Sequence, residues 1–375
     1  MKIVRLGEPK VIMSNPDSKH DYFAWPTAAR LKNGKIAVVA SGFRLRHVCP
    51  FGKTVISYSE DEGETYTLPA PVIDTVLDDR DGGIAAFGES GVIVTSMNNA
   101  VELQMQYANT AKGGTASFHR RGNAFSAYDH AYLDGLTPEE VQAVRGATCR
   151  ISFDNGVSFG KICKAPVTSP HGPAVLLDGS LLWIGNPLEC KASPNFDMYR
   201  VEAHRIYEDG SSALVGVVPL PEIAGDKPDF CEVHAVTLDD GSVLAHIRVE
   251  RKGEHPLFTL FQSVSRDGGR TWSEPRQILS DLGGAPSHLL KTSSGMLICS
   301  YGYRCEPYCV RVMFSRDNGE TWENESDIYV NGINKDLGYP STVEFSDGSF
   351  ITVFYAHLGK EESAVILQQR WKITE

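Results

Sequence analysis

A single eight-residue turn pattern occurs four times in this chain, and it constrains the fold more than any other feature. The pattern is Ser-x-Asp-x-Gly-x-Thr/Ser-aromatic, and its copies span residues 59–66, 152–159, 265–272 and 315–322. The Asp side chain of each copy can accept hydrogen bonds from backbone N–H groups across the turn, and the Gly supplies a residue with φ > 0. The final aromatic ring packs beneath the turn, and the flanking apolar alternation predicts strands. Because the pattern repeats, we expect a fold built from similar units.

A second, independent repeat sets the number of units. Six dipeptides with Gly in second place each separate two apolar, β-branched runs, which is a strong hairpin signal; they are Asn33-Gly34, Ser90-Gly91, Asp178-Gly179, Asp240-Gly241, Ser294-Gly295 and Asp347-Gly348. The aspartates of the four turns lie at positions 61, 154, 267 and 317. They give the same number if one unit is about 50 residues and if the gaps 61–154 and 154–267 each hold a unit whose turn has eroded. The sequence therefore predicts an all-β fold, a six-bladed β-propeller of four-stranded blades around a central channel. No linker-like stretch divides residues 1–375, so we expect a single domain.

One interval between hairpins is longer than the others and predicts an insertion. It lies between Gly91 and Gly179, and we place a partly helical insertion near residues 105–147. The segment 137–140, Thr-Pro-Glu-Glu, has the form of a capping box with Pro at the first helical position. The insertion is either an excursion on the surface or a rim over the mouth of the channel.

Charge and composition exclude several classes of protein. The formal net charge is −11, the pI is near 5.5 and no basic stripe is present, which argues against nucleic-acid binding. No apolar run is long enough to cross a bilayer, and the N-terminus lacks the apolar core of a secretory signal, so we expect a cytoplasmic protein without membrane association. A processed secreted chain would look the same. The eight cysteines show no CxxC spacing, and we expect neither a metal nor a cofactor.

Two residues at the predicted channel entrances have side chains that can do chemistry together. The first strand of each blade enters the channel, and the positions nine residues before the hairpin glycines should mark these entrances; they are Trp25, Gly82, Pro170, Glu232, Pro286 and Tyr339. Glu232 and Tyr339 therefore occupy equivalent positions in two blades. A carboxylate beside a phenol can accept its proton, which turns a group with a pKa near 10 into a usable nucleophile. The alternative is structural: a packed Tyr and a hydrogen-bonded Glu.

Together, the Asp-box (BNR) turns, the six blades, the inward Glu and the Tyr near the last blade resemble the sialidase (neuraminidase) superfamily over essentially the whole chain. That family consists of exo-acting glycosidases in which a Tyr is the nucleophile, a Glu is its base, an Asp is the acid/base and three arginines bind the substrate carboxylate. The resemblance implies that Tyr339, in a Gly-Tyr-x-Ser-Thr context, is the nucleophile and Glu232 its base. It places the second arginine at Arg248 and the third at Arg304.

At the first arginine position the chain departs from the family. It has Ala24 there, with Trp25 beside it. Trp25 either stacks on a sugar face or packs in the core, and Arg44 or Arg46 in the following loop could restore the positive charge. Because one bidentate carboxylate contact is lost, the pattern favours an acidic sugar with a differently placed carboxylate, such as a uronic acid, over ordinary sialic acid.

The acid/base position also differs. The loop in which the family carries its Asp, residues 42–53, contains no carboxylate. His47 lies in this loop, and its unperturbed pKa near 6.5 suits acid/base work. Asp81, at the second channel entrance, is the alternative acid/base. His171 lies at the third entrance and is a further candidate for substrate contact.

Three functions fit this pattern. The first is a sialidase-like, exo-acting, retaining glycoside hydrolase that cleaves a terminal acidic sugar from a small molecule or oligosaccharide. The second is a polysaccharide lyase that acts on a uronate-containing glycan. The third is a glycan-binding propeller without catalytic activity. The sequence does not indicate which sugar or linkage is recognised, nor an oligomeric state.

Overall fold

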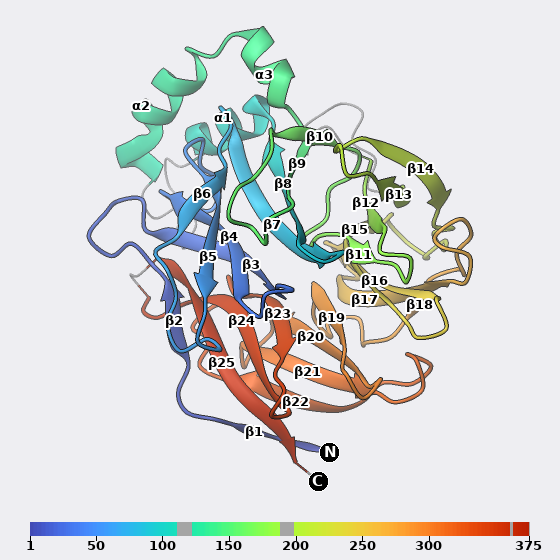
Figure 1. The fold of residues 1–375 in the computed structure, drawn as a ribbon. Coiled ribbons are helices and arrows are strands. Elements are labelled where there is room, and N and C mark those ends of the chain that lie inside the picture. The colour runs from blue at the N-terminus through green and yellow to red at the C-terminus, as the bar shows by residue number, and fades with distance from the viewer. Residues whose placement is uncertain (111–121, 188–198, 361–362, 375) are drawn as a thin grey trace.

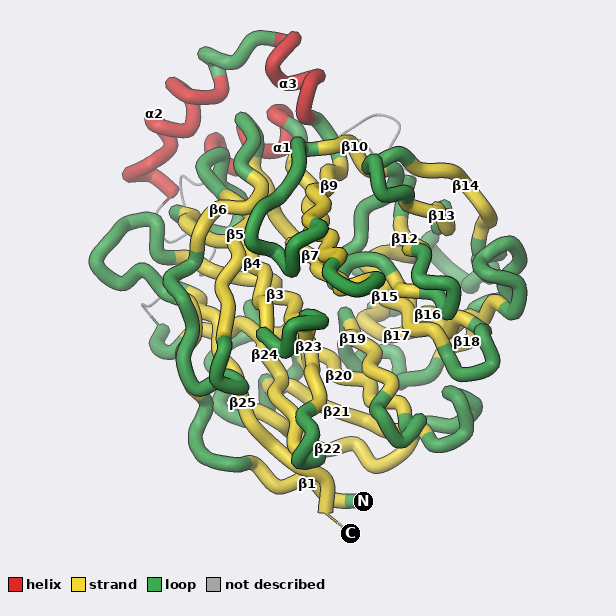
Figure 2. Tube along the Cα trace, viewed as in Figure 1, coloured by secondary structure: helices red, strands yellow, loops and turns green. Residues whose placement is uncertain are grey.

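The computed structural model describes residues 1–110, 122–187, 199–360 and 363–374, and it confirms the all-β, six-bladed propeller. Six antiparallel sheets lie side by side around a central axis (Figure 1). The first strand of every blade contacts the first strands of both neighbouring blades, so the six inner strands close into a ring. Strands run through the whole ring, and the helices of the described residues lie together in one place (Figure 2).

Five blades each take four consecutive strands. Blade 1 comprises β3 (Tyr22–Arg30), β4 (Ile36–Arg44), β5 (Lys53–Ser59) and β6 (Ala70–Ile73). Blade 2 comprises β7 (Asp78–Phe87), β8 (Gly91–Asn99), β9 (Ala147–Ser152) and β10 (Cys163–Ala165). Blade 3 comprises β11 (Ala174–Val175), β12 (Leu181–Gly185), β13 (Glu202–Ile206) and β14 (Ser212–Val217). Blade 4 comprises β15 (Asp229–Thr237), β16 (Val243–Arg251), β17 (Leu257–Ser265) and β18 (Arg276–Gln277), and blade 5 comprises β19 (Ser287–Lys291), β20 (Leu297–Tyr303), β21 (Cys309–Ser315) and β22 (Glu323–Tyr329).

The sixth blade joins the two ends of the chain. Its strands are β23 (Gly338–Glu344), β24 (Ser349–His357), β25 (Ala364–Thr374) and, from the N-terminal segment, β1 (Lys2–Arg5); β2 (Lys10–Met13) also pairs with β25. Lys2 lies opposite Thr374 and Arg5 lies opposite Trp371, so both ends of the described chain lie together (Figure 1). Opening the ring at blade 6 therefore requires the loss of backbone hydrogen bonds between the two ends.

The four repeated turns share one set of hydrogen bonds. In the last copy, the Thr321 N–H and hydroxyl donate to the two carboxylate oxygens of Asp317 at 2.9 and 2.6 Å. The Gly319 N–H donates to Ser315 Oγ at 2.8 Å. The same contacts recur around the other three turn aspartates, Asp61, Asp154 and Asp267. Hydrogen bonds from the neighbouring hydroxyl and N–H groups lower the pKa of each of these carboxyl groups to about 2.

These lowered pKa values predict how stability depends on pH. The aspartates are stronger acids in the folded chain than in the unfolded one, so their contribution is complete above the unfolded pKa, about 4, and is lost as the pH falls through about 2. Replacing Asp317 by Asn should lower the unfolding free energy at pH 7 and reduce the further loss between pH 4 and pH 2. Denaturant unfolding at both pH values measures this, and an Asp317→Asn variant with the wild-type pH dependence would contradict it.

The positions of the turns correct one step of the unit count. The copies follow the third strands of blades 1, 2, 4 and 5, so the copies at 59–66 and 152–159 belong to neighbouring blades and the gap between them holds no eroded unit. That gap is long because an insertion separates β8 from β9. The two blades without a copy are blade 3, where a shorter turn joins β13 to β14, and blade 6, where the outer strand β1 is not reached by a turn.

The insertion contains three helices, as the partly helical prediction required. They are α1 (Val101–Thr110), α2 (Gly122–Leu133) and α3 (Pro138–Val144), and they lie at one edge of the ring beside blade 2 (Figure 1). The capping box is present, because the Glu140 N–H donates to the Thr137 hydroxyl and the Thr137 N–H donates to Glu140. The predicted insertion also covered residues 111–121, which lie outside the described residues. Within the described chain, no helix is long and apolar enough to cross a membrane.

The hydrophobic core lies between neighbouring blades. Fully buried Val38 and Val55 of blade 1 belong to one cluster with Ile351 and Val353 of blade 6. Each such aliphatic side chain contributes about 1.5–3 kcal/mol when it is removed from water. This packing fixes the angle of each blade and hence the positions of the inner strands around the axis.

Candidate active site

The side chains that converge near the axis stand on unusual backbone at the blade entrances. Five of these residues have positive φ values of 55°, 53°, 70°, 51° and 48°; they are Trp25, Asp81, His171, Glu232 and Tyr339. In β3, β7, β15 and β23 the pairing with the second strand shifts at the same place, which marks a β-bulge. A left-handed backbone is uncommon for non-glycine residues, and such strain clusters at functional sites. Counting nine residues back from each hairpin glycine finds three of the five and misses Asp81 and His171 by one residue.

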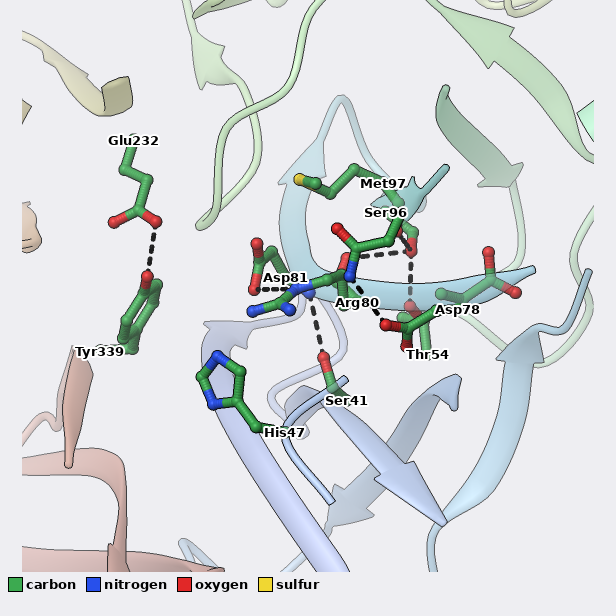
Figure 3. A network of polar contacts seen from close by, with 12 residues as sticks. Ser41, His47, Thr54, Asp78, Arg80, Asp81, Ser96, Met97, Glu232 and Tyr339 are labelled. Atoms are coloured by element: carbon green, nitrogen blue, oxygen red, sulfur yellow. Dashed lines mark hydrogen bonds and ion pairs between the residues drawn. The ribbon is translucent and has the colours of Figure 1, made fainter. Parts of the chain in front are cut away.

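Tyr339 and Glu232 form a hydrogen-bonded pair between blades 6 and 4. The Tyr339 hydroxyl donates to Glu232 Oε1 at 2.5 Å (Figure 3). Arg248 Nη1 donates to the other carboxylate oxygen of Glu232 at 2.6 Å and to the Tyr339 hydroxyl at 3.2 Å. Tyr339 is 4% exposed and Glu232 is 9% exposed. The fold thus places a phenol, a carboxylate and a guanidinium in mutual contact, although the Tyr and the Glu are 107 residues apart in sequence.

The residue before Tyr339 allows blade 6 to approach blade 5 closely at this point. Gly338 has φ = +115°, and a Cβ atom added there would lie 3.1 Å from the Cα atom of Gly302. Only glycine combines this backbone with this close contact between the inner strand β23 and β20, the second strand of blade 5.

Burial sets the protonation of Tyr339. Burial, and then the neighbouring Glu232 carboxyl, raise the pKa of Tyr339 well above its usual value, while Arg248 and Arg304 lower it. The resting phenol is therefore protonated. Its proton already lies on the hydrogen bond to Glu232, so Glu232 can accept it when an electrophilic centre approaches the phenol oxygen.

A cavity of about 380 Å³ contains this pair, which is within the range of small-ligand pockets. Residues of blades 1, 2, 4, 5 and 6 line it, and α1 adds Leu103 and Tyr107. The insertion therefore forms part of the cavity wall, which supports the rim interpretation over that of a plain surface excursion. The charged residues on the wall are of both signs: Arg80, Arg248, Lys252 and Arg304, with Asp229, Glu232 and Glu250.

Arg248 and Arg304 differ in how much of their charge is already balanced. Arg248 donates to Glu232 and also pairs closely with Glu250. Arg304 donates from Nε to the Leu337 carbonyl at 3.0 Å and from Nη2 to the Tyr355 hydroxyl at 3.2 Å. In the part of the chain that the structure describes, no carboxylate pairs with Arg304. Its charge is therefore the one in the cavity that an acidic ligand could best neutralise.

Arg80 is a residue of the cavity that the sequence did not single out. Its guanidinium carbon lies 4.0 Å from the centre of the Trp25 ring, and its Nε lies 3.4 Å from Asp81 Oδ1. Trp25 is only 1% exposed, so its ring supports the Arg80 cation rather than offering a free face to a sugar. The available sequence signal was the position of Arg80 directly before Asp81 at a channel entrance.

Hydrogen bonds behind the wall fix the Arg80–Asp81 bulge. The Asp81 N–H donates to Ser41 Oγ at 3.0 Å, and Ser96 Oγ donates to the Arg80 carbonyl at 3.1 Å (Figure 3). Thr54 and Ser96 share a further hydrogen bond of 2.7 Å. Strands from blades 1 and 2 therefore hold this bulge in place from two sides.

Of the two predicted acid/base residues, His47 forms part of the cavity wall. Its ring stands edge-on to Trp25, with 4.8 Å between the ring centres. Burial lowers the pKa of His47, and Asp336 acts in the opposite direction. Asp81 is 3% exposed, and its carboxylate is engaged with Arg80. Both side chains point toward the Tyr339–Glu232 pair (Figure 3), but His47 is better placed to reach a ligand.

The structure does not bring Arg44 or Arg46 into the cavity. Arg44 is fully buried, donates to Asp78 at 2.5 Å and donates to the Asp79 carbonyl at 2.9 Å. Arg46 is 3% exposed and pairs with Asp129 of α2. Both guanidinium groups therefore balance buried carboxylates inside the fold and do not line the cavity.

His171 lies on the other side of the pair, in a second cavity of about 440 Å³. Its ring is 5.3 Å from those of His234 and His288 and 6.5 Å from that of Tyr339. Burial lowers the pKa of His171 to about 3, so it is neutral. The structure therefore separates His171 from the cavity around Tyr339. Among the described residues, no three His, Cys, Asp or Glu side chains are arranged as a metal site.

Neither a protein-family model nor a curated protein sequence matches this chain. Solved structures do. A protein of unknown function from Dyadobacter fermentans is similar over 99% of both chains, with a TM-score of 0.72 and 18% identity. The NanB sialidase from Streptococcus pneumoniae has a TM-score of 0.67 and 15% identity, over 99% of this chain and 71% of that one. The intramolecular trans-sialidase from Ruminococcus gnavus has a TM-score of 0.61 and 11% identity, over 97% of each chain.

The chain has a sialidase-like propeller fold. Identities of 11–18% establish the architecture and leave the activity to be argued from the site. The residues that carry that argument are Tyr339, Glu232, Arg304, Arg80 and His47.

Proposed function

We propose that this protein is an exo-acting, retaining glycoside hydrolase that releases a terminal acidic sugar, with Tyr339 as nucleophile and Glu232 as its base. The observation that carries the proposal is the 2.5 Å hydrogen bond from the Tyr339 hydroxyl to Glu232 within a ligand-sized cavity. Both residues stand on left-handed backbone at bulges of equivalent inner strands. A glycan-binding protein has little need of a phenol and a carboxylate held together at two strained positions.

In the first half of the reaction, the Tyr339 oxygen attacks the anomeric carbon as its proton passes to Glu232. The bond from the anomeric carbon to the leaving oxygen breaks, and His47 Nε2–H donates the proton that the leaving oxygen requires. The products of this half are an aryl glycoside, in which the anomeric carbon is bonded to the Tyr339 oxygen, and a free alcohol or aglycone. Arg248, which contacts both Glu232 and Tyr339, keeps the pair aligned.

In the second half, water attacks the anomeric carbon and passes a proton to His47. The bond to Tyr339 breaks, and the phenol oxygen regains its proton from Glu232. Two displacements at one carbon retain the configuration of the sugar, and both proton carriers return to their starting state.

The acidic group of the sugar is assigned to Arg304 and Arg80. Arg304 has no carboxylate partner among the described residues. Arg80 places a positive charge beside Trp25 at the entrance of blade 2, which neighbours the entrance of blade 1 where Ala24 lies. Arg80 thus supplies a cation near the position at which the first arginine is absent. Because Arg80 stands on blade 2, whereas the first clamp position falls on Ala24 of blade 1, we favour a carboxylate placed differently from that of sialic acid, as in a uronic acid.

A lyase is the second candidate, and one observation favours it. The Tyr339 phenol can pass its proton to Glu232 along their 2.5 Å hydrogen bond, and the phenolate so formed can accept a C–H proton next to a carboxylate neutralised by Arg304. The C–H and C–O bonds would break, a C=C bond would form, and His47 would protonate the leaving oxygen. The product would be an unsaturated sugar that absorbs ultraviolet light.

A panel of aryl glycosides of acidic and neutral sugars, including sialic and glucuronic acids, tests the proposal. Wild type should release one aglycone from an acidic sugar without an unsaturated product, and Tyr339→Phe should release none. An ultraviolet-absorbing product from a uronate-containing glycan would instead establish the lyase. If no substrate gives a product and the protein binds to a glycan array, the result would indicate a non-catalytic propeller.

Arg304 should govern affinity for the acidic group. Arg304→Gln should raise KM for the acidic glycoside by about 10–100-fold, since a hydrogen bond to a charged group contributes about 1.5–3 kcal/mol, and should leave KM for the sugar with its carboxylate reduced to an alcohol nearly unchanged. Lys252→Gln is the control, because Lys252 also carries a positive charge on the cavity wall but its side chain is 93% exposed at the rim. Equal effects of Arg304→Gln on both sugars would contradict the assignment.

A further inference from the structure

One buried carboxylate of the site region forms no direct ion pair with an Arg or Lys side chain of the described chain. Asp336 is 7% exposed. The hydroxyls of Tyr22 and Tyr355 donate to its two oxygens, each at 3.0 Å, and His357 Nε2 lies 2.9 Å from Oδ2. His47 Nδ1 lies 3.7 Å from Oδ1. Two phenols and two imidazoles thus contact this carboxyl group, and one of the imidazoles, His47, belongs to the cavity wall.

These contacts determine which nitrogen of His47 carries hydrogen. Tyr22 has one hydroxyl proton, and it donates that proton to Asp336 Oδ2. The Tyr22 oxygen, which is 3.3 Å from His47 Nδ1, can then only accept a hydrogen bond from that nitrogen, and a carboxylate can only accept as well. Nδ1 of His47 is therefore the protonated nitrogen, and Nε2 is the nitrogen that can exchange a proton with a ligand.

Hydrogen bonds keep Asp336 ionised. Burial would raise the pKa of Asp336, but the hydrogen bonds and charges of His357 and His47 outweigh burial and hold this pKa well below its usual range. The Tyr355 hydroxyl that donates to Asp336 also accepts from Arg304. Asp336 thus lies at the centre of a fixed network that touches the cavity wall at His47 and at Arg304.

We propose that Asp336 is a positioning residue for His47, and that the two form the acid/base dyad of this site in place of a catalytic Asp. This inference rests on the proposed glycosidase function. Asp336 fixes the Nδ1–H tautomer and the ring orientation of His47, and it stabilises the imidazolium that exists before proton donation and after proton uptake. His47 is the residue that touches the leaving oxygen, and Asp336 acts only through it.

The charges around His47 give the sign of the pH effect. Asp336 and Tyr22 face the ring, and Arg80 of blade 2 and Arg44 of blade 1 also act on it; burial and the two arginines lower its pKa, whereas Asp336 raises it. The acid form of His47 is lost as the pH rises through this pKa, so kcat/KM should fall on the alkaline side of a value below about 6.5. Asp336→Asn removes the interaction that raises the pKa and should shift this descending limb to lower pH.

The first test compares leaving groups. Asp336→Asn should lower kcat/KM by about 10²–10⁴-fold for an alkyl glycoside, whose leaving oxygen needs a proton, and by less than about tenfold for a nitrophenyl glycoside, whose leaving oxygen does not. His47→Gln should show the same dependence. Asp327→Asn, which breaks an ion pair with Arg311 outside the cavity, is the matched control and should show no such dependence. An equal loss with both leaving groups would overturn the dyad.

The second test does not depend on activity, so it separates failure of the dyad from failure of the proposed function. In wild type labelled with nitrogen-15 histidine, NMR should show His47 in the Nδ1–H form, and Asp336→Asn should lower its pKa and mix its tautomers. If Asp336→Asn does not fold, Tyr22→Phe removes the hydroxyl between the two groups and should also mix the tautomers. An unchanged tautomer and pKa of His47 in the folded variant would overturn the proposal, whatever the glycosides show.

Discussion

Tyr339→Phe is expected to lower kcat by at least about 10³-fold, because phenylalanine has no oxygen that can form the bond to the anomeric carbon. The ring itself should stay in place. It packs near Trp25 at 6.4 Å and Tyr355 at 6.0 Å between ring centres, with the Arg304 guanidinium 5.5 Å away. Glu232 keeps its hydrogen bond to Arg248, so the loss of stability should be about 1.5–3 kcal/mol, as for one hydrogen bond to a charged group. Steady-state kinetics and denaturant unfolding measure the two effects separately.

The chain offers a closely matched control for this change. The Tyr301 hydroxyl donates to Glu325 at 2.6 Å in blade 5, outside the cavity. Tyr301→Phe removes the same chemical contact, and it should reduce stability by a similar amount while leaving kcat near the wild-type value. If Tyr339→Phe retains more than about a tenth of the activity, Tyr339 is not the nucleophile.

Glu232→Gln is expected to have the second largest effect, a fall in kcat of about 10²–10⁴-fold, because the amide cannot accept the phenol proton during the attack. The pKa of Tyr339, already raised by burial, gives the phenol no route to ionise without this base. Gln keeps the size of the side chain and can still accept one hydrogen bond. The comparison of kcat on one activated substrate, at the pH optimum of the wild type, measures the effect.

One further variant, Glu250→Gln, separates the role of Glu232 as a base from its structural role. Glu250 is the other carboxylate on Arg248 and does not contact Tyr339. Glu250→Gln should therefore destabilise the protein about as much as Glu232→Gln, through the loss of one charged partner of Arg248, but should lower kcat by no more than about tenfold. Equal losses of kcat in the two variants would mean that the charge balance of Arg248, rather than proton transfer to Glu232, carries the effect.

The architecture was readable from the sequence because its signals are local. A Ser, an Asp and a Thr within seven residues are enough to build each repeated turn, as the contacts of Asp317 show, and a Gly in a hairpin marks a strand end wherever it lies. The assignment of an eroded unit between Asp61 and Asp154 was wrong, because a gap in a repeat has the same length whether it holds a lost turn or an insertion. Only the positions of α1 to α3 distinguish the two.

The Tyr339–Glu232 pair was predictable for the same reason, since equivalent positions in repeated blades converge on one axis. Arg44 and Arg46 were misplaced because their partners, Asp78 and Asp129, are distant in sequence and become neighbours only when blade 2 and its insertion pack on blade 1. Asp336 was not found at all. It lies on no blade strand, and its proposed role in positioning His47 depends on side chains from three other segments of the chain.

The most direct test of the account is to trap the covalent intermediate. The fluorinated, activated glycoside of the acidic sugar that the aryl panel identifies should form an intermediate slowly enough to accumulate. The proposed mechanism predicts a mass increase of one glycosyl group on the peptide that contains Tyr339, and no such increase in Tyr339→Phe. A glycosyl group on Glu232 or elsewhere, or turnover of the reagent without any adduct, would contradict it.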